Sequence, residues 1–205
     1  YRFQIIGDNL YFISYSYDEA TQESEQVLYT YSLAQQKETD RFILTQHSPE
    51  DGDVYRSADA YLLADGGMIV CERTYDSSEE GDEETSFLLK RYDPGHTLIA
   101  QTDLQDVLED GGEGFYVQSM FGDSEGRIYV VGDSTILLFD AELNKKGVID
   151  AGDTYLNAAG LGKDGKAYVN MYEPMQNMPV IKEIDFEKAD FGESFAGAVN
   201  ENGNT

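Results

Sequence analysis

Glu125-Gly126-Arg127-Ile128-Tyr129-Val130-Val131 is a glycine turn that leads into an apolar strand, and it decides the fold because it recurs. The same order of turn and strand returns in Gly7-Asp8-Asn9-Leu10-Tyr11-Phe12-Ile13, in Asp65-Gly66-Gly67-Met68-Ile69-Val70-Cys71 and in Asp164-Gly165-Lys166-Ala167-Tyr168-Val169. Asn202-Gly203-Asn204 begins a fifth copy. A chain built from repeats buries its core by stacking one repeat on the next. The repeat therefore predicts the architecture before any single residue does.

The spacing of the turn glycines gives the size of one repeat. Gly126, Gly165 and Gly203 follow one another at intervals of about 40 residues, the length of a four-stranded propeller blade. The earlier intervals are longer, which indicates insertions in the first two repeats. We expect one propeller-like domain over residues 1–205, with repeat units at 1–46, 55–102, 115–151 and 154–196 and the start of a fifth at 197–205.

Each repeat contains short strands rich in Tyr, Phe, Val and Ile that are separated by turn residues, a pattern typical of all-β proteins. The strand after the glycine turn, as at 10–13 and 128–131, is almost wholly apolar, which predicts cover on both faces. A strand at 115–118 should precede the third glycine turn. One two-turn helix is expected over 103–110, where Asp103 can cap its start.

These features predict an all-β chain with the fold of a β-propeller, made of four repeats plus the start of a fifth. Propellers have about four to eight blades and leave only short, protected strand edges. A chain that stops within its fifth repeat would leave an edge open. We therefore expect a part of a larger propeller, with a closed ring of four blades and a free tail at 198–205 as the alternative.

The repeated turn and strand, followed by an apolar strand that ends in Asp, as in 88–98 (Leu-Leu-Lys-Arg-Tyr-Asp-Pro-Gly-His-Thr-Leu), resembles the blades of the broad NHL, YWTD and quinoprotein-like β-propellers. The chain is also similar to the propeller-like region of surface lipoproteins of Gram-positive bacteria that carry a solute-binding domain of an ABC transporter. The second resemblance implies an extracellular or cell-surface location. The signature of WD40 blades is not visible, since the chain has no Trp, and the Asp-box of sialidases cannot be placed.

The charge of the chain restricts its partners. Fourteen Lys and Arg stand against 40 Asp and Glu, so the formal net charge is −26. Nucleic-acid binding needs clustered Lys and Arg to neutralise phosphates, and an anionic membrane surface would be repelled in the same way. No apolar run approaches the roughly 20 residues that span a bilayer. We expect neither nucleic-acid binding nor membrane insertion, and the acidic surface is most simply a solubilising one.

Catalytic and metal-binding motifs are weak in this sequence. There is no nucleophile elbow, phosphate loop or zinc-protease motif. Cys71, the single cysteine, lies in an apolar strand and should be a buried core thiol, while His47 and His96 lie among turn residues and should be surface histidines. The acidic runs 76–84 and 109–113 lack the spacing of a calcium loop. We expect no catalytic residue, no metal and no cofactor.

Insertions at one equivalent loop are the most useful indication of function. The third repeat joins its first two strands by a tight turn at 132–134, whereas the others use longer connections at 18–26, 76–85 and 173–179. Equivalent loops should emerge on one face, and repeat proteins often bind through the face that carries insertions. The residues that flank these loops, Tyr15, Tyr17, Arg73, Tyr75 and Tyr172, are the predicted ligand-binding face, because Tyr offers a flat ring and a hydroxyl. Alternatively, they are ordinary strand-end residues on solvated hairpins.

Two functions are consistent with this sequence. The first, which we favour, is a non-catalytic extracellular module that binds a carbohydrate, a peptide or a companion domain of its parent protein through the insertion-loop face. The second is a fragment of a propeller-fold glycan hydrolase or lyase. A glycosidase needs two placed carboxylates, and among 40 acidic residues the sequence does not select a pair.

Overall fold

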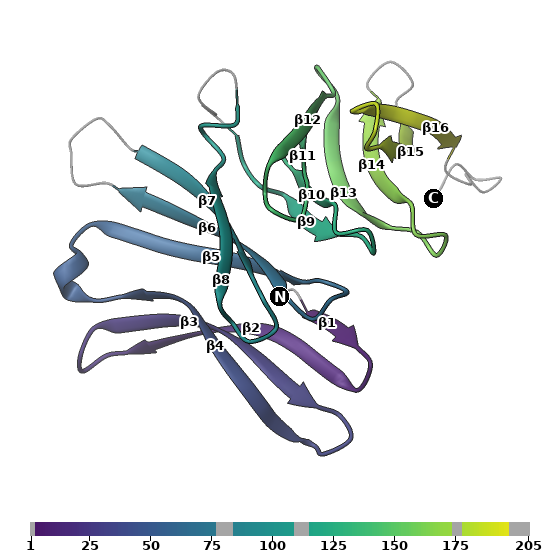
Figure 1. Cartoon of the computed structure of the whole chain (residues 1–205). Coiled ribbons are helices and arrows are strands. Elements are labelled where there is room, and N and C mark those ends of the chain that lie inside the picture. Colours follow the sequence, from purple (N-terminus) through teal and green to yellow (C-terminus); the bar gives the residue numbers. More distant parts are fainter. Residues whose placement is uncertain (1–2, 77–83, 109–114, 174–177, 197–205) are drawn as a thin grey trace. The chain divides into compact units, whose positions relative to one another are not determined.

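The structure is a computed structural model, and it describes residues 3–76, 84–108, 115–173 and 178–196. These residues form sixteen strands and one short 3-10 helix, η1, at Pro49–Asp51. The strands make four antiparallel sheets of four strands each, and we call these sheets blades 1 to 4 (Figure 1). Within every blade the strands lie in chain order, so each strand pairs with the strand that precedes or follows it.

The strand bounds define the blades. Blade 1 contains β1 (Phe3–Ile6), β2 (Asn9–Asp18), β3 (Glu23–Ser32) and β4 (Lys37–His47), and blade 2 contains β5 (Val54–Leu62), β6 (Met68–Asp76), β7 (Glu84–Tyr92) and β8 (Leu98–Asp103). Blade 3 contains β9 (Ser119–Gly122), β10 (Ile128–Val131), β11 (Thr135–Phe139) and β12 (Lys145–Asp150), and blade 4 contains β13 (Tyr155–Leu161), β14 (Ala167–Glu173), β15 (Met178–Asp185) and β16 (Asp190–Ala196). The expectation of an all-β propeller is thus confirmed.

Apolar strands follow the glycine turns because both of their faces are covered. All four residues of β10 are buried, as are the first four of β6, including Cys71. In a strand with one face exposed to solvent, apolar and polar residues would alternate instead. The expectation of a buried thiol at Cys71 is confirmed.

Aspartates organise three of the turns between strands in the same way. At Asp93, Asp123 and Asp140 the carboxylate accepts hydrogen bonds from the backbone N–H groups two and four residues later. The N–H of the same aspartate donates to the carbonyl four residues later. An Asp side chain can mimic a backbone turn in this manner, so part of the acidic composition serves the turns.

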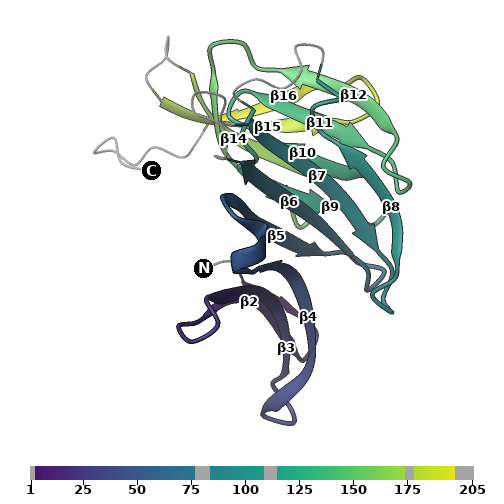
Figure 2. The same cartoon turned by 90° about the vertical axis from the view of Figure 1, so that its left-hand side faces the viewer.

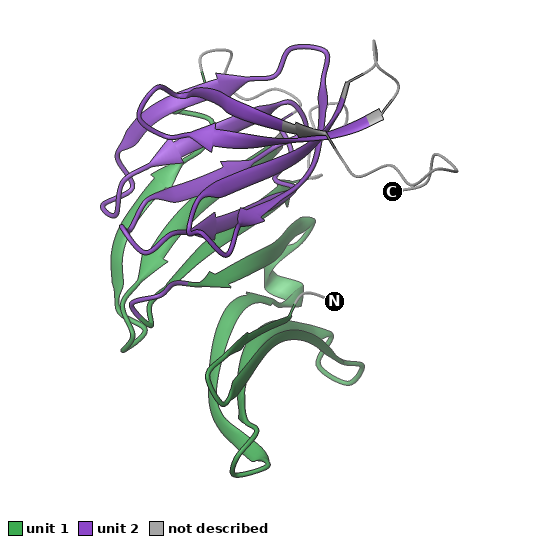
Figure 3. Ribbon diagram, turned by 90° about the vertical axis from the view of Figure 1, so that its right-hand side faces the viewer, with its two compact units in different colours: residues 1–62, 66–112 green, residues 63–65, 113–205 purple. Residues whose placement is uncertain are grey.

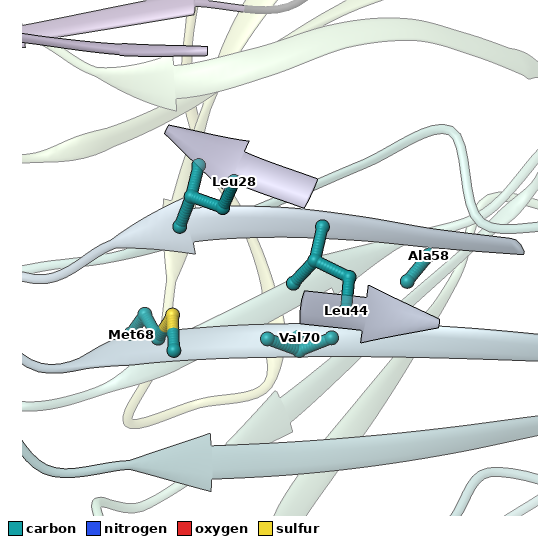
Figure 4. Close-up of a cluster of buried hydrophobic side chains, with 5 residues drawn as sticks. All are labelled: Leu28, Leu44, Ala58, Met68 and Val70. Atoms are coloured by element: carbon teal, nitrogen blue, oxygen red, sulfur yellow. The ribbon is translucent and has the colours of Figure 1, made fainter. Parts of the chain in front are cut away.

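The chain divides into two compact units, residues 1–62 with 66–112 and residues 63–65 with 113–205 (Figure 3). The first unit contains blades 1 and 2, and its core includes Leu28 and Leu44 of blade 1 and Ala58, Met68 and Val70 of blade 2 (Figure 4). In the second unit, which contains blades 3 and 4, the rings of Phe121 and Tyr129 stack with centroids 4.7 Å apart.

Two glutamines of blade 1 bind the backbone of β5 in blade 2. The side-chain oxygen of Gln4 accepts a hydrogen bond from the N–H of Leu62 at 2.8 Å, and its amide nitrogen donates to the Leu62 carbonyl at 3.4 Å. The side-chain oxygen of Gln26 accepts a bond from the N–H of Ala58 at 2.7 Å. The glutamines therefore satisfy polar groups on the free edge of β5, which would otherwise lack a strand partner.

Three local predictions are wrong. The strand expected at 115–118 lies at 119–122, because Ser119 to Gly122 are the residues that pair with β10. Residues 104–108 form turns and not a helix, although Asp103 does accept a hydrogen bond from the N–H of Gln105 at 2.9 Å. The fully buried side chain of Leu104 fixes the chain at the end of β8, where a helix would begin. The expected loop at 18–26 is mostly strand, because β2 and β3 continue to Asp18 and Glu23.

No helix in the described ranges has both the length and the apolar character that a membrane span requires.

Candidate functional site

The candidate site lies at the far end of the β2–β3 hairpin in blade 1. β2 has 10 residues, whereas the equivalent strand of blade 3, β10, has 4. The insertion predicted in the first repeat is therefore a longer hairpin, which Figure 2 shows as the extended, curved ribbons of β2, β3 and β4. Residues 48–53, which include η1, connect this end of β4 to β5.

Strand register brings two rows of polar side chains to this end. Tyr17 pairs with Ser24, which pairs with His47, and these three lie on one face of the sheet. Ser16, Glu25 and Gln46 form the next row on the opposite face. Together with the hairpin turn and η1, both rows line one open groove.

The groove has a volume of about 890 Å³, within the usual range of small-molecule sites. All of its lining residues belong to the first unit. They are Ser16, Tyr17, Asp18, Glu19, Glu23, Ser24, Glu25, Gln46, His47, Ser48 and Asp51, and we call this feature the tip groove. Five of them are acidic, so the groove disfavours anions.

Two carboxylates of the tip groove are paired with arginines outside its lining. Glu25 lies 3.0 Å from the Arg41 guanidinium, and Asp51 lies 3.2 Å from that of Arg56. Asp51 also accepts hydrogen bonds from the backbone N–H of Ser48 at 2.8 Å and from its hydroxyl at 3.0 Å. These bonds to Ser48, and then the contact with Arg56, lower the pKa of Asp51 to about 2. Asp51 is therefore an ionised acceptor with a fixed orientation.

The hairpin turn is also held by its own carboxylate. Asp18 accepts hydrogen bonds from the N–H groups of Ala20 and Thr21, at 2.8 and 3.3 Å. Gln22 adopts a positive φ of 58° to close the turn, and the Thr21 hydroxyl lies 3.2 Å from Glu23. The acidic tip thus has a defined backbone shape, as a preformed groove requires.

Aromatic side chains continue from the groove onto blade 2. The rings of His47 and Tyr55 stack with centroids 5.2 Å apart, and Tyr55 pairs across the strands with Tyr75. His47 is thus a half-buried residue at the end of β4, not a surface turn histidine as predicted, and its Nδ1 is buried without a hydrogen bond. Stacking on an amphipathic tyrosine gives this wall of the groove an aromatic surface.

The predicted binding residues occupy different places. Tyr17 lines the tip groove, and Tyr15 lies two residues away on the same face of β2, with 66% of its surface exposed. Tyr75 is the cross-strand partner of Tyr55, whose ring stacks on His47 at the groove. Arg73 lies two residues before Tyr75 on β6, where its guanidinium is 5.9 Å from the centre of the Phe87 ring.

Tyr172 belongs to the second unit and is described with it. It pairs with Tyr155 across β13 and β14, and both side chains are exposed. A cross-strand tyrosine pair therefore occurs in blade 4 as it does in blade 2 with Tyr55 and Tyr75.

The sequence did not identify the carboxylates or the serines of the tip groove. Strand pairing brings them together from separate parts of the sequence, so no local motif contains them. Each is also one of many similar residues in the chain. The length of the insertion and the tyrosines that flank it, Tyr15 and Tyr17, pointed to this place.

Other candidate centres are weaker. Among the residues that the structure describes, no group of three or more His, Cys, Asp or Glu is arranged to hold a metal ion. The acidic runs at 77–83 and 109–113 lie outside those residues. Burial, together with the negative charges of Asp59 and Glu72, raises the pKa of Cys71 to about 12, so its thiol is a poor nucleophile at neutral pH. His96 is a turn residue with a positive φ of 63°, 3.5 Å from Asp40.

Comparison with known proteins supports the fold alone. No protein-family model matches the sequence, and a search of curated proteins also finds no match. A protein of unknown function from Bacteroides caccae is similar in structure, with a TM-score of 0.51 and 9% identity over 93% of this chain. The chain spans 63% of the length of that protein.

A GH43 β-1,3-galactosidase, solved with galactodeoxynojirimycin, is similar with a TM-score of 0.52. The identity is 11%, and the match covers 95% of this chain and 74% of the galactosidase chain. That enzyme has a propeller fold. The four antiparallel four-stranded sheets of the described residues, together with this likeness, identify the fold as a β-propeller and are consistent with four blades.

Proposed function

We propose that this chain is a non-catalytic binding module that takes a neutral, hydroxyl-rich ligand, a carbohydrate, in the tip groove. The observation that carries the proposal is the groove itself, which combines oriented carboxylates, serine hydroxyls and exposed tyrosines at the end of an extended hairpin. Sugars present hydroxyl groups that donate to carboxylates and accept from amides, and their apolar ring faces pack on aromatic rings.

The electrostatics of the groove favour such a ligand over an anion. Asp18, Glu19, Glu23, Glu25 and Asp51 all line it, and within the described part of the chain Glu25 and Asp51 have the arginine partners given above. Sugar hydroxyls can donate to a carboxylate without a change of charge. A peptide with hydroxyl or amide side chains is the second ligand class that this chemistry suits.

The location of the module belongs to the same proposal. Its resemblance to propeller-like regions of Gram-positive surface lipoproteins suggests a role outside the cell beside a solute-binding domain. A companion domain of that kind would be the protein partner of the module.

Glycan hydrolysis is the alternative, and the GH43 galactosidase is the observation that favours it. A general acid in such an enzyme needs a raised pKa. Among the described residues, the four aspartates whose pKa is displaced, Asp51, Asp140, Asp164 and Asp185, are all shifted downward. These shifts make the four aspartates unsuitable as a general acid, and of the four only Asp51 lines the tip groove.

An array of glycans and peptides tests the proposal. The wild-type chain is compared with Tyr17→Ala and Glu25→Gln, and with Tyr116→Ala, a control tyrosine that is exposed in the second unit. We expect a glycan signal that falls about tenfold in each groove variant, or about 1.4 kcal/mol, and is unchanged in the control. Equal glycan binding by all four proteins would exclude the tip groove.

The enzymatic alternative has its own measurement. Each glycan that binds is incubated with the chain, and release of reducing ends is followed. We expect no release above the level of buffer. Hydrolysis that disappears in a carboxylate-to-amide variant would replace the binding proposal by the enzymatic one.

A further inference from the structure

The two ring nitrogens of His47 lie in different surroundings. Nδ1 is buried and forms no hydrogen bond with any described residue. Nε2 is not among the buried polar atoms that lack a partner, and it has no hydrogen bond to the described part of the chain either, so it is accessible. Because His47 lines the tip groove, Nε2 is the nitrogen that a ligand in the groove can reach.

These surroundings decide which nitrogen carries the proton. A neutral imidazole has one N–H, and its other nitrogen keeps a lone pair. The partner that each nitrogen finds sets the choice between the two forms. A buried N–H without an acceptor is rarer in folded proteins than a buried acceptor without a donor. The proton therefore belongs on Nε2, where water or a ligand can accept it.

Tyr55 of blade 2 holds the imidazole of His47 in place. Their ring centroids are 5.2 Å apart and their planes meet at 22°, a stacked arrangement. A ring held in this way gives its N–H a fixed direction, whereas a hydroxyl such as that of Ser24 can rotate and either donate or accept. A fixed donor selects among ligands, because a ligand without an acceptor at that point leaves the donor unpaired.

The other polar groups of the tip groove complement this donor. Its acidic residues, which include Asp18 and Glu23, accept hydrogen bonds when they are ionised and cannot donate. Tyr17, Ser24 and His47 form one row across β2, β3 and β4. Because neighbouring strands lie about 5 Å apart, the backbones of Tyr17 and His47 are separated by roughly 10 Å, with the small Ser24 between them. A sugar above Ser24 therefore has an aromatic ring on one side and a donor on the other.

We propose that His47 is the specificity-determining donor of the tip groove and that Tyr55 is its positioning residue. The ligand is a sugar that accepts a hydrogen bond from the Nε2–H of His47 while its own hydroxyls donate to the carboxylates. A hydroxyl oxygen and an amide carbonyl oxygen of a glycan both meet this requirement. The inference rests on the proposed function for its ligand, but the position of the proton is a property of the protein alone.

Nitrogen-15 NMR of the histidine rings tests the position of the proton. The chain has two histidines, so His96→Phe in an untagged protein leaves only the ring of His47. At mildly alkaline pH, where an imidazole is usually neutral, a protonated and an unprotonated ring nitrogen have well separated shifts. We expect the proton of His47 on Nε2. A proton on Nδ1, or equal sharing between the two nitrogens, would overturn the inference whether or not a glycan binds.

The glycan array then tests the donor. His47→Phe keeps an aromatic ring against Tyr55 but has no nitrogen, and it should not destabilise the first unit because it removes an unpaired buried atom. We expect its glycan signal to fall about tenfold, the effect of one lost hydrogen bond. His96→Phe is the matched control and should bind as the wild type does. Amide exchange at Ala58 shows whether the first unit of each variant is folded.

The positioning role of Tyr55 has its own pair of variants. Tyr55→Phe keeps the stacked ring, and its glycan signal should equal that of the wild type. Tyr55→Ala removes the ring, and its signal should fall about as far as that of His47→Phe. Loss of binding in Tyr55→Phe would mean that the tyrosine acts through its hydroxyl and would overturn the positioning role.

The array also separates this inference from the proposed function. Equal signals from His47→Phe and the wild type, where Tyr17→Ala and Glu25→Gln lose theirs, would overturn the donor role and leave the proposed function intact. A wild-type protein that binds no glycan on the array would overturn both.

Discussion

The glutamine contacts between blades 1 and 2 lead to a quantitative prediction. Gln4→Met and Gln26→Met keep side chains of similar length but remove the acceptors for the N–H groups of Leu62 and Ala58. A buried N–H left without a partner costs about 1–3 kcal/mol of folding free energy; Ala58 is buried and Leu62 is half-buried, so the lower end of that range applies to Leu62. The two N–H groups are four residues apart on β5, or roughly 13 Å, so their effects should add. We expect each variant to lose about 1–3 kcal/mol and the double variant about 2–6 kcal/mol.

Urea unfolding combined with amide hydrogen exchange measures this loss. Exchange is read at Ala58 and Leu62, because it reports on the first unit even if the two units unfold separately. Gln101→Met, an exposed glutamine on β8, is the matched control and should change stability by less than about 0.5 kcal/mol. Unchanged protection of both amides in the double variant would refute the bridging role of the glutamines.

Three further predictions concern local sites. Ser48→Ala should raise the pKa of Asp51 from about 2 toward the ordinary value of 3.8. Because the pKa of Asp51 is lowered in the folded protein, its ionised carboxyl stabilises the folded state fully above pH 3.8, and this stabilisation disappears as the pH falls toward 2. Carbon-13 NMR titration of the Asp51 carboxyl, with the η1 amides followed in parallel, measures both effects. Cys71 should resist Ellman's reagent at pH 8 until urea unfolds the first unit, and rapid labelling of the native protein would contradict its burial. Leu28→Ala should cost about 2–5 kcal/mol in urea unfolding, against less than about 0.5 kcal/mol for the exposed Leu98→Ala.

The sequence predicted most of the fold because the repeat is local. The apolar strands at 10–13, 68–71 and 128–131 all lie inside observed strands. The ends of those strands were harder to predict. A loop was expected at 18–26, but β3 already begins at Glu23, because Glu23 to Gln26 pair with the end of β2. Tertiary pairing overrides local preference at such positions.

The tip groove was less accessible to prediction. Its tyrosine, Tyr17, was found because aromatic residues flanked an insertion. The carboxylates of Glu25 and Asp51 acquire their role through Arg41 and Arg56, which lie 16 and 5 residues away in the sequence. With 40 acidic residues in the chain, no spacing rule separates these two from the rest.

The aspartates of the turns also determine how the protein responds to acid. Burial opposes ionisation of Asp140, but its hydrogen bonds with Lys146 and with Asn144 are stronger and lower its pKa to about 2. The pKa of Asp164 is lowered as well, chiefly by the Tyr168 hydroxyl. Asp140 therefore keeps its negative charge in a medium acidic enough to protonate ordinary Asp and Glu, and the shift of Asp164 has the same direction. An anionic polymer or surface would therefore still meet negative charges at these turns at acidic pH.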